Sequence, residues 1–108
     1  MKENQLGELQ EIILLTILLL KENAYGVTIR REIKEQVNRS ISRGALHTTL
    51  TRLEEKGLLR SWQGESDEKR GGMRKRYYEV TQKGVSVLQE VKANRDRYWN
   101  QIPTLSLR

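Results

Sequence analysis

Cysteine is absent from this 108-residue chain, which excludes disulfide bonds and thiolate chemistry and fits a reducing cytoplasm. The longest apolar run, residues 12–20, is interrupted by Thr16, whereas a helix that spans a membrane needs about 20 apolar residues. Residues 1–5 carry one lysine and one glutamate, and no small-residue cleavage site follows the apolar run, so we expect no signal peptide. The length is that of one domain. We therefore expect a cytoplasmic protein that has no membrane partner.

Residues suited to catalysis or metal binding are also scarce. His47 is the only histidine, and no second histidine or paired carboxylate is spaced to complete a metal site with it. The sequence shows no nucleophile with a base and an orienting group, and no glycine loop that would cradle a phosphate. We expect no enzymatic activity, no metal and no cofactor.

Positive charge is present in excess and is unevenly distributed. The net charge of +6 divides into −1 for residues 1–38, +5 for residues 39–76 and +2 for residues 77–108. A basic middle segment is typical of a surface that meets a polyanion such as nucleic acid. It is also compatible with a surface that is basic only for solubility, so charge alone leaves both readings open.

Hydrophobic periodicity predicts three helices in the first half of the chain. Residues 6–20 are apolar on nearly all sides, which indicates burial against their own domain and against another chain. A second helix is expected after Gly26, with Ile29, Ile33 and Val37 in one stripe. The third is expected over residues 43–56, with a leucine stripe that faces the core, and its members are Leu46, Leu50 and Leu53.

The third helix also carries signals at both ends. Ser42 is a favourable N-cap, since its hydroxyl can accept a bond from an unpaired backbone N–H. Ile41 and Leu46 occupy the two positions of a hydrophobic staple. Gly57 suits the left-handed position that follows a helix. This helix is therefore the best-defined element of the sequence.

Two strands and a last helix complete the pattern. Residues 58–65 and 73–81 are expected to form a hairpin around Gly71 and Gly72, and Thr81 can cap a helix that ends before Pro103. The order helix, helix, helix, strand, strand, helix predicts a mainly α fold with a small β-hairpin, a winged helix-turn-helix. We expect a DNA-binding domain over 1–81, a C-terminal helix over 82–102 and a tail over 103–108.

The outward face of the third helix is the first candidate site. Opposite the leucine stripe lie Gly44, Thr48 and Thr51, with His47 and Arg52 on the flanks. Short side chains let a helix approach base pairs closely, and threonine can contact thymine methyls and base edges. The alternative is that this face is an ordinary solvent-exposed helix surface with no ligand. The predicted contacts with double-stranded DNA are Ser42, Arg43, Gly44, His47, Thr48, Thr51 and Arg52.

The hairpin is the second candidate site. Five basic residues fall within eight positions around the paired glycines, and they can follow a phosphate backbone or enter a minor groove. The alternative is a charged loop that only protects a strand edge. The predicted contacts are Lys69, Arg70, Arg74, Lys75 and Arg76.

Three segments together resemble the PadR family of transcriptional regulators, over essentially residues 6–102. They are AYGVTI at 24–29, ISRGALHTTLTRLEEKGLL at 41–59 and RKRYYEVTQKG at 74–84. His47 departs from the family pattern, in which tyrosine is usual after the leucine. The single C-terminal helix resembles the compact subgroup.

The resemblance implies a homodimer that represses by binding operator DNA and is relieved in many members by a small molecule, which we expect to be hydrophobic or aromatic. Because a dimer has two-fold symmetry, we expect the operator to be near-palindromic. It places the recognition helix at 42–56, the wing tip at 66–73, and a dimer helix at 82–101 against 6–20 of the partner subunit. Tyr98 and Trp99 could line an effector pocket or belong to the interface core. The alternative function is a winged-helix module that binds a protein and not DNA. The expected interface residues are Leu9, Ile13, Leu88, Val91, Tyr98, Trp99 and Ile102.

Overall fold

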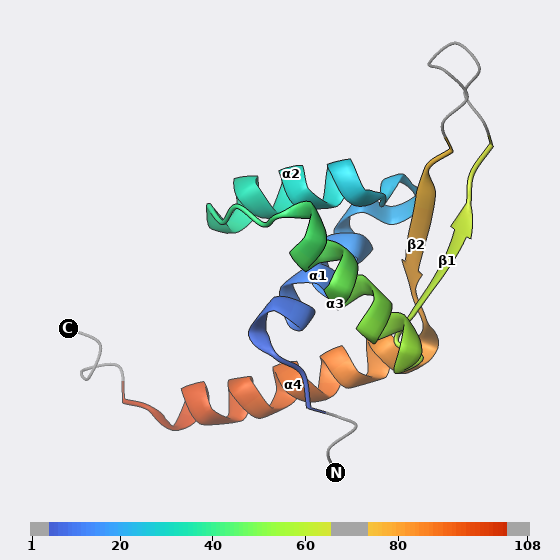
Figure 1. The fold of residues 1–108 in the computed structure, drawn as a ribbon. Helices are drawn as coiled ribbons and strands as arrows, with labels where there is room; N and C mark the ends of the chain where they lie inside the picture. The colour runs from blue at the N-terminus through green and yellow to red at the C-terminus, as the bar shows by residue number, and fades with distance from the viewer. Residues whose placement is uncertain (1–4, 66–73, 104–108) are drawn as a thin grey trace.

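The computed structural model describes residues 5–65 and 74–103 (Figure 1). Four α-helices, a short 3₁₀ turn and a two-stranded hairpin follow one another in the predicted order. The elements are α1 (Glu8–Leu20), η2 (Lys21–Asn23), α2 (Gly26–Val37), α3 (Arg43–Glu55), β1 (Leu59–Gln63), β2 (Arg76–Val80) and α4 (Gln82–Gln101). None of the helices within these residues is long and apolar enough to cross a membrane.

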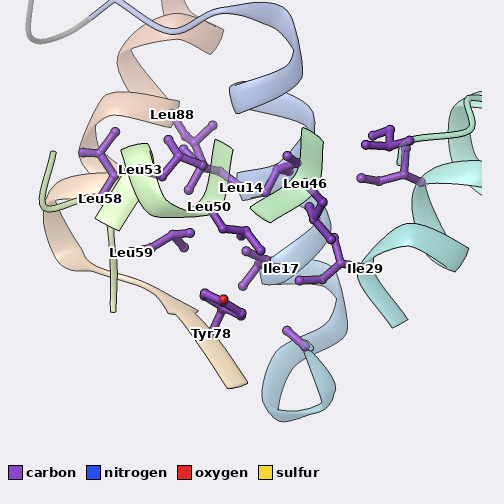
Figure 2. Close-up of a cluster of buried hydrophobic side chains, with 14 of the residues drawn as sticks. Leu14, Ile17, Ile29, Leu46, Leu50, Leu53, Leu58, Leu59, Tyr78 and Leu88 are labelled. Atoms are coloured by element: carbon purple, nitrogen blue, oxygen red, sulfur yellow. The ribbon is translucent and has the colours of Figure 1, made fainter. Parts of the chain in front are cut away.

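The hydrophobic core forms around α1, which contacts α2, α3, α4 and β2. Ile13 and Leu14 of α1 are fully buried, as are Ile29 and Ile33 of α2. Figure 2 shows how the leucines of α3 meet side chains of α1 and of the hairpin in one cluster. The predicted stripe of α2 stops short of its end, because Val37 is the last helical residue and is 49% exposed.

Both ends of α3 are set by the local signals that the sequence contains. The Ser42 hydroxyl accepts a hydrogen bond from the backbone N–H of Ala45 at 3.0 Å, which confirms the predicted cap. At the other end, Gly57 has φ +79°, and the N–H of Leu58 donates to the carbonyl of Leu53 at 2.9 Å. This is a Schellman ending, and both leucines are buried beneath it.

The hairpin is shorter than its sequence pattern and is joined to the start of α2. β1 and β2 pair antiparallel from Leu59 opposite Val80 to Gln63 opposite Arg76. Beyond that ladder, Tyr25 and Tyr77 form an isolated antiparallel bridge, and the N–H of Tyr78 donates to the carbonyl of Ala24 at 3.0 Å. Strand β2 is therefore held on both sides, by its pairing with β1 and by the chain that enters α2.

Helix α4 begins against the end of α3 and then leaves the body of the domain (Figure 1). Thr81 caps it by accepting from the N–H of Gly84 at 3.1 Å, and its hydroxyl donates to the carbonyl of Gly57 at 2.7 Å. Lys83 also donates to the carbonyl of Lys56 at 3.1 Å. Val87 and Leu88 are buried in the domain core, whereas residues 92–101 are exposed.

Candidate nucleic-acid interface

The outward face of α3 is polar and open, as the leucine stripe predicts. Leu46, Leu50 and Leu53 are at most 3% exposed, while Thr48 and Thr51 on the opposite face are exposed. Of the remaining predicted contact residues of α3 and its cap, all are exposed as well: Ser42, Arg43, Gly44, His47 and Arg52. The first two turns of α3 thus present hydroxyls and cations around a small residue.

Thr49 differs from its neighbour Thr48 although the two residues are chemically identical. Thr49 is half-buried, and its hydroxyl donates to the carbonyl of Ala45 at 2.9 Å. The hydroxyl of Thr48 makes no hydrogen bond with any residue that the structure describes, so it remains available to a ligand on the open face.

A cavity of about 350 Å³ brings α3 and the hairpin onto the same surface. It lies between α2, α3 and the strand β2, and its lining includes Arg43 and His47 together with Lys75 and Arg76. Residues from the two candidate sites, separated by nearly thirty positions in the chain, therefore face one concave surface. Arg74 is exposed beside them, and Lys69 and Arg70 lie outside the described residues.

Tyr25, the residue that precedes α2, orients the side chain of Lys75. The Lys75 ammonium lies 4.4 Å from the centroid of the Tyr25 ring and donates to its hydroxyl at 3.4 Å. The Tyr25 ring in turn meets Tyr77 edge to face, with 5.4 Å between centroids, and Tyr77 stacks on Trp62. A cation above an aromatic face is attracted by the ring quadrupole. The aromatic cluster thus holds one wing cation in a defined place.

Arg76 is connected to α3 through the hairpin. It donates to the Ser61 hydroxyl at 3.3 Å, and that hydroxyl donates to the carboxylate of Glu54 at 2.8 Å. The neighbouring Tyr78 is 8% exposed, and burial raises the pKa of its phenol; Arg76 opposes this shift and Glu54 adds to it. Tyr78 is therefore a neutral hydrogen-bond donor at physiological pH.

Sequence reasoning did not identify two residues that shape this surface. Tyr25 positions Lys75, and Arg30 of α2 donates through Nε to the carbonyl of Ile41 at 2.8 Å, which fixes the segment that leads into α3. A tyrosine immediately before a helix carries no local signal for either role. Both contacts depend on segments that meet only after folding.

The expected dimer residues fall into three groups, which are buried, partly buried and exposed. Ile13 and Leu88 are buried in their own subunit at 0% and 7% exposure, so they leave no surface for a partner, because α1 and α4 pack on each other within the domain. Leu9 and Val91 are partly buried. Tyr98, Trp99 and Ile102 are exposed. Three leucines of α1 are exposed as well, within the segment 6–20 that the family resemblance places against the partner subunit, and they are Leu15, Leu18 and Leu19.

The proposed effector residues do not share one pocket within the subunit. Tyr98 lines a groove of about 810 Å³ between the N-terminal end of α1 and α4, together with Leu6 and Val91. Trp99 is 59% exposed and lies outside that lining. Within residues 5–65 and 74–103, no group of three His, Asp or Glu side chains lies close enough to hold a metal ion.

Comparison with known proteins places these features in a family. Residues 14–90 match the model of the Transcriptional regulator PadR-like family. Among solved structures, a PadR-like transcription factor from Bacteroides fragilis is 32% identical, with a TM-score of 0.70 over 85% of this chain and 84% of that chain. A PadR family regulator from Clostridium difficile is 27% identical, with a TM-score of 0.67 over 92% and 98% of the two chains.

A third solved structure supports the same assignment. The PadR family transcriptional regulator from Eggerthella lenta is 28% identical, with a TM-score of 0.67 over 86% of this chain and 80% of that chain. A comparison with curated proteins finds no match. The family model covers most of the chain, and the relatives share its helix order and hairpin, so the fold is a winged helix and the chain belongs to the PadR-like family of transcriptional regulators.

Proposed function

We propose that this protein is a sequence-specific regulator that binds double-stranded DNA as a homodimer and represses transcription. In this proposal, α3 enters the major groove and the hairpin follows the phosphate backbone. Thr48 and Thr51 contact base edges, and Lys75 and Arg76 neutralise phosphates. A regulator of this kind would act in the cytoplasm and carry no catalytic activity.

The observation that carries the proposal is the shared concave surface of α3 and β2. Arg43 and His47 line the same cavity as Lys75 and Arg76, and none of the residues that line it is acidic. The exposed threonine face of α3 continues from this surface. A polar helix face with cations on both sides has the composition that a duplex requires, with base contacts at its centre and phosphate contacts around it.

Exposed apolar side chains support the dimeric state. Leu15, Leu18 and Leu19 of α1 are 42–56% exposed, and Tyr98 and Trp99 of α4 are 75% and 59% exposed. Monomeric proteins rarely leave large apolar patches in water. Association through α1 and the distal part of α4 would cover both sets, and it would set two α3 helices about one helical turn of DNA, roughly 34 Å, apart.

The experiment that tests DNA binding begins with an unbiased selection. Genomic fragments retained by the protein at near-physiological salt are sequenced, and the enriched duplex is compared with a shuffled duplex by fluorescence anisotropy over a range of salt concentrations. We expect a near-palindromic site, bound at least roughly a thousandfold more tightly than the shuffled duplex. Equal binding of the two duplexes would contradict sequence specificity, whereas no binding to either duplex would favour the protein-interaction module.

The proposed repression of transcription, and its relief by an effector, can be tested with a reporter gene. Because a dimer on a promoter excludes polymerase, a reporter gene behind the selected site should be expressed less when the protein is present. A small hydrophobic or aromatic effector bound near Tyr98 and Trp99 would restore expression. Tryptophan fluorescence checks this site: the signal of wild-type protein should be quenched by such a compound, and the Trp99→Phe variant should lose that quenching.

A further inference from the structure

The cavity between α2, α3 and β2 has an apolar interior and a cationic rim. Val27, Leu46 and Leu50 contribute its apolar side chains. Arg43, Lys75 and Arg76 are charged residues of the lining. An apolar cavity alone would accept any apolar group. An apolar interior with a cationic rim instead favours a ligand that carries both an apolar body and a negative charge.

The lining also contains a hydrogen-bond donor without a protein partner. Tyr78 is more than nine-tenths buried, and within residues 5–65 and 74–103 its hydroxyl makes no hydrogen bond. The same hydroxyl keeps contact with open space, since no side-chain polar atom of the described residues is both fully buried and unsatisfied, and Tyr78 lines both this cavity and a second hollow beside Leu18 and Trp62. A buried polar group that lacks a partner is costly unless a water or a ligand supplies one.

Two observations argue that the anionic end of such a ligand is favoured here. No acidic residue lines the cavity. The carboxylate of Glu54, to which Arg76 is connected through Ser61, accepts a hydrogen bond from Ser61 and lies outside the lining. The Lys75 ammonium lies above the Tyr25 ring and forms no ion pair with any residue of 5–65 and 74–103, so the described residues that line the cavity leave its charge uncompensated. The volume of about 350 Å³ lies at the small end of ligand pockets.

We propose that this cavity binds a small amphipathic anion, one carboxylate or sulfonate on an apolar ring or short chain, and that the bound anion competes directly with DNA. The competition rests on the proposed function, because Arg43, His47, Lys75 and Arg76 are also predicted DNA contacts. The site lies within a single subunit, and it is separate from the Tyr98 and Trp99 region. Exclusion of DNA from it needs no conformational change.

The probe for this site is 2-naphthoate, with its neutral analogue 2-naphthamide as the chemical control. Titration into the ¹⁵N-labelled protein is followed by NMR. We expect the amide signals of Val27, Leu46 and Tyr78 to shift with naphthoate, and the naphthamide to bind more weakly by at least about threefold, the contribution of one or two partly exposed charge pairs. Shifts confined to Tyr98 and Trp99, or no shifts, overturn the proposal.

A matched pair of variants locates the site. Val27→Asp puts a carboxylate into the apolar part of the lining, in the first turn of α2, where helices tolerate an acidic residue well. It should weaken naphthoate binding about fivefold or more. Val37→Asp changes an equally exposed valine of the same helix that does not line the cavity, and it should leave binding unchanged. Equal affinities in the two variants would contradict the assignment.

Competition with DNA is measured separately, so that the two proposals fail independently. Saturating naphthoate should raise the apparent dissociation constant of the enriched duplex, by the factor that its own affinity predicts for a shared site. If naphthoate binds at Val27 and no DNA binds, the proposed function and the competition both fail, while the anion site itself stands. If DNA binds and naphthoate at its measured saturation leaves the affinity unaltered, the competitive site is refuted.

Discussion

Lys75 places its ammonium 4.4 Å above the ring of Tyr25, fifty positions earlier in the chain. The tyrosine is the residue that precedes α2, and the lysine precedes β2. Through this contact, a charged side chain of the wing packs on a residue of the helix-turn-helix. A lysine that is otherwise free to sample several rotamers is thereby directed toward the concave surface beside α3.

The first prediction concerns this pair. If Tyr25 directs Lys75 to a phosphate, Tyr25→Leu and Lys75→Ala should each lower the slope of log affinity against log salt by about 1.8, because the dimer loses one phosphate contact, worth about 0.9, in each subunit. The double variant should lower it no further than either single change, whereas Tyr25→Phe should retain most of the slope. Lys92→Ala, on the exposed distal part of α4, is the control and should have no effect. Additive losses in the double variant would show that the two side chains act separately.

The second prediction separates the two adjacent threonines of α3. Thr48→Ala removes an exposed hydroxyl from each subunit of the dimer and should reduce discrimination between the enriched and the shuffled duplex about tenfold for each half-site, or about a hundredfold in all. Thr49→Ala removes a hydroxyl that is already bonded to Ala45 and should leave discrimination intact. Anisotropy titrations with both duplexes measure the ratio. A Thr48 variant with unchanged discrimination would mean that the reading face lies elsewhere.

The third prediction tests the apolar surface of α1. Leu19 is 56% exposed, and Leu19→Glu would bury a charge in any interface formed there, so it should raise the dimer dissociation constant at least about tenfold. Sedimentation velocity over a concentration series measures this. Val37→Glu introduces the same charge at a valine of α2 that is 49% exposed and should sediment as wild type does. The same sedimentation behaviour in both variants would exclude α1 from the interface.

The fourth prediction concerns two helical glycines with opposite surroundings. A β-carbon on Gly84 would lie 2.5 Å from the carbonyl oxygen of Leu58, so Gly84→Ala should cost about 1–3 kcal/mol of folding free energy. A β-carbon on Gly44 meets nothing within 4 Å, and Gly44→Ala should stabilise the protein by about 0.5–1 kcal/mol. Urea denaturation measures both changes. Changes of the same sign would contradict the packing described here.

The fifth prediction follows from the buried phenol of Tyr78. Burial raises its pKa above the ordinary value of 10.0, so the folded state holds this proton more tightly than the unfolded chain does. The stabilisation is complete below pH 10 and is lost as the pH rises through the folded pKa. The free energy of unfolding should therefore fall less steeply above pH 10 in Tyr78→Phe than in wild type. Urea denaturation over a series of pH values measures the two slopes, and equal slopes would contradict the burial of this phenol.

Local signals in the sequence sufficed for α3 and for the start of α4. Ser42, Gly57 and Thr81 act through hydrogen bonds and backbone angles within a few residues, so their types and spacing predict where each helix begins or ends. The buried side of α3 could also be predicted from the sequence, because the spacing of its leucines alone decides which side faces the core. The polar face that carries the candidate site follows from the same period.

Features that depend on tertiary packing could not be predicted from the sequence. Apolar spacing marks Ile13 and Leu88 as buried, but it does not say whether their own subunit or a partner covers them, and both belong to the subunit core. Tyr25 meets Tyr77 and Lys75 only after α2 and the hairpin come together. The hairpin ladder is also shorter than the apolar pattern, since pairing ends at Gln63 opposite Arg76.

The junction between α3 and α4 has a mechanical consequence. Three hydrogen bonds join it: the Thr81 hydroxyl to Gly57, the Thr81 N–H to Leu58, and the Lys83 ammonium to Lys56. Helix α4 therefore cannot swivel about its own start without dragging the C-terminal end of α3 along. In a dimer held by its distal part, α4 would act as a lever arm, and a small change of angle at its far end would retilt the reading helix.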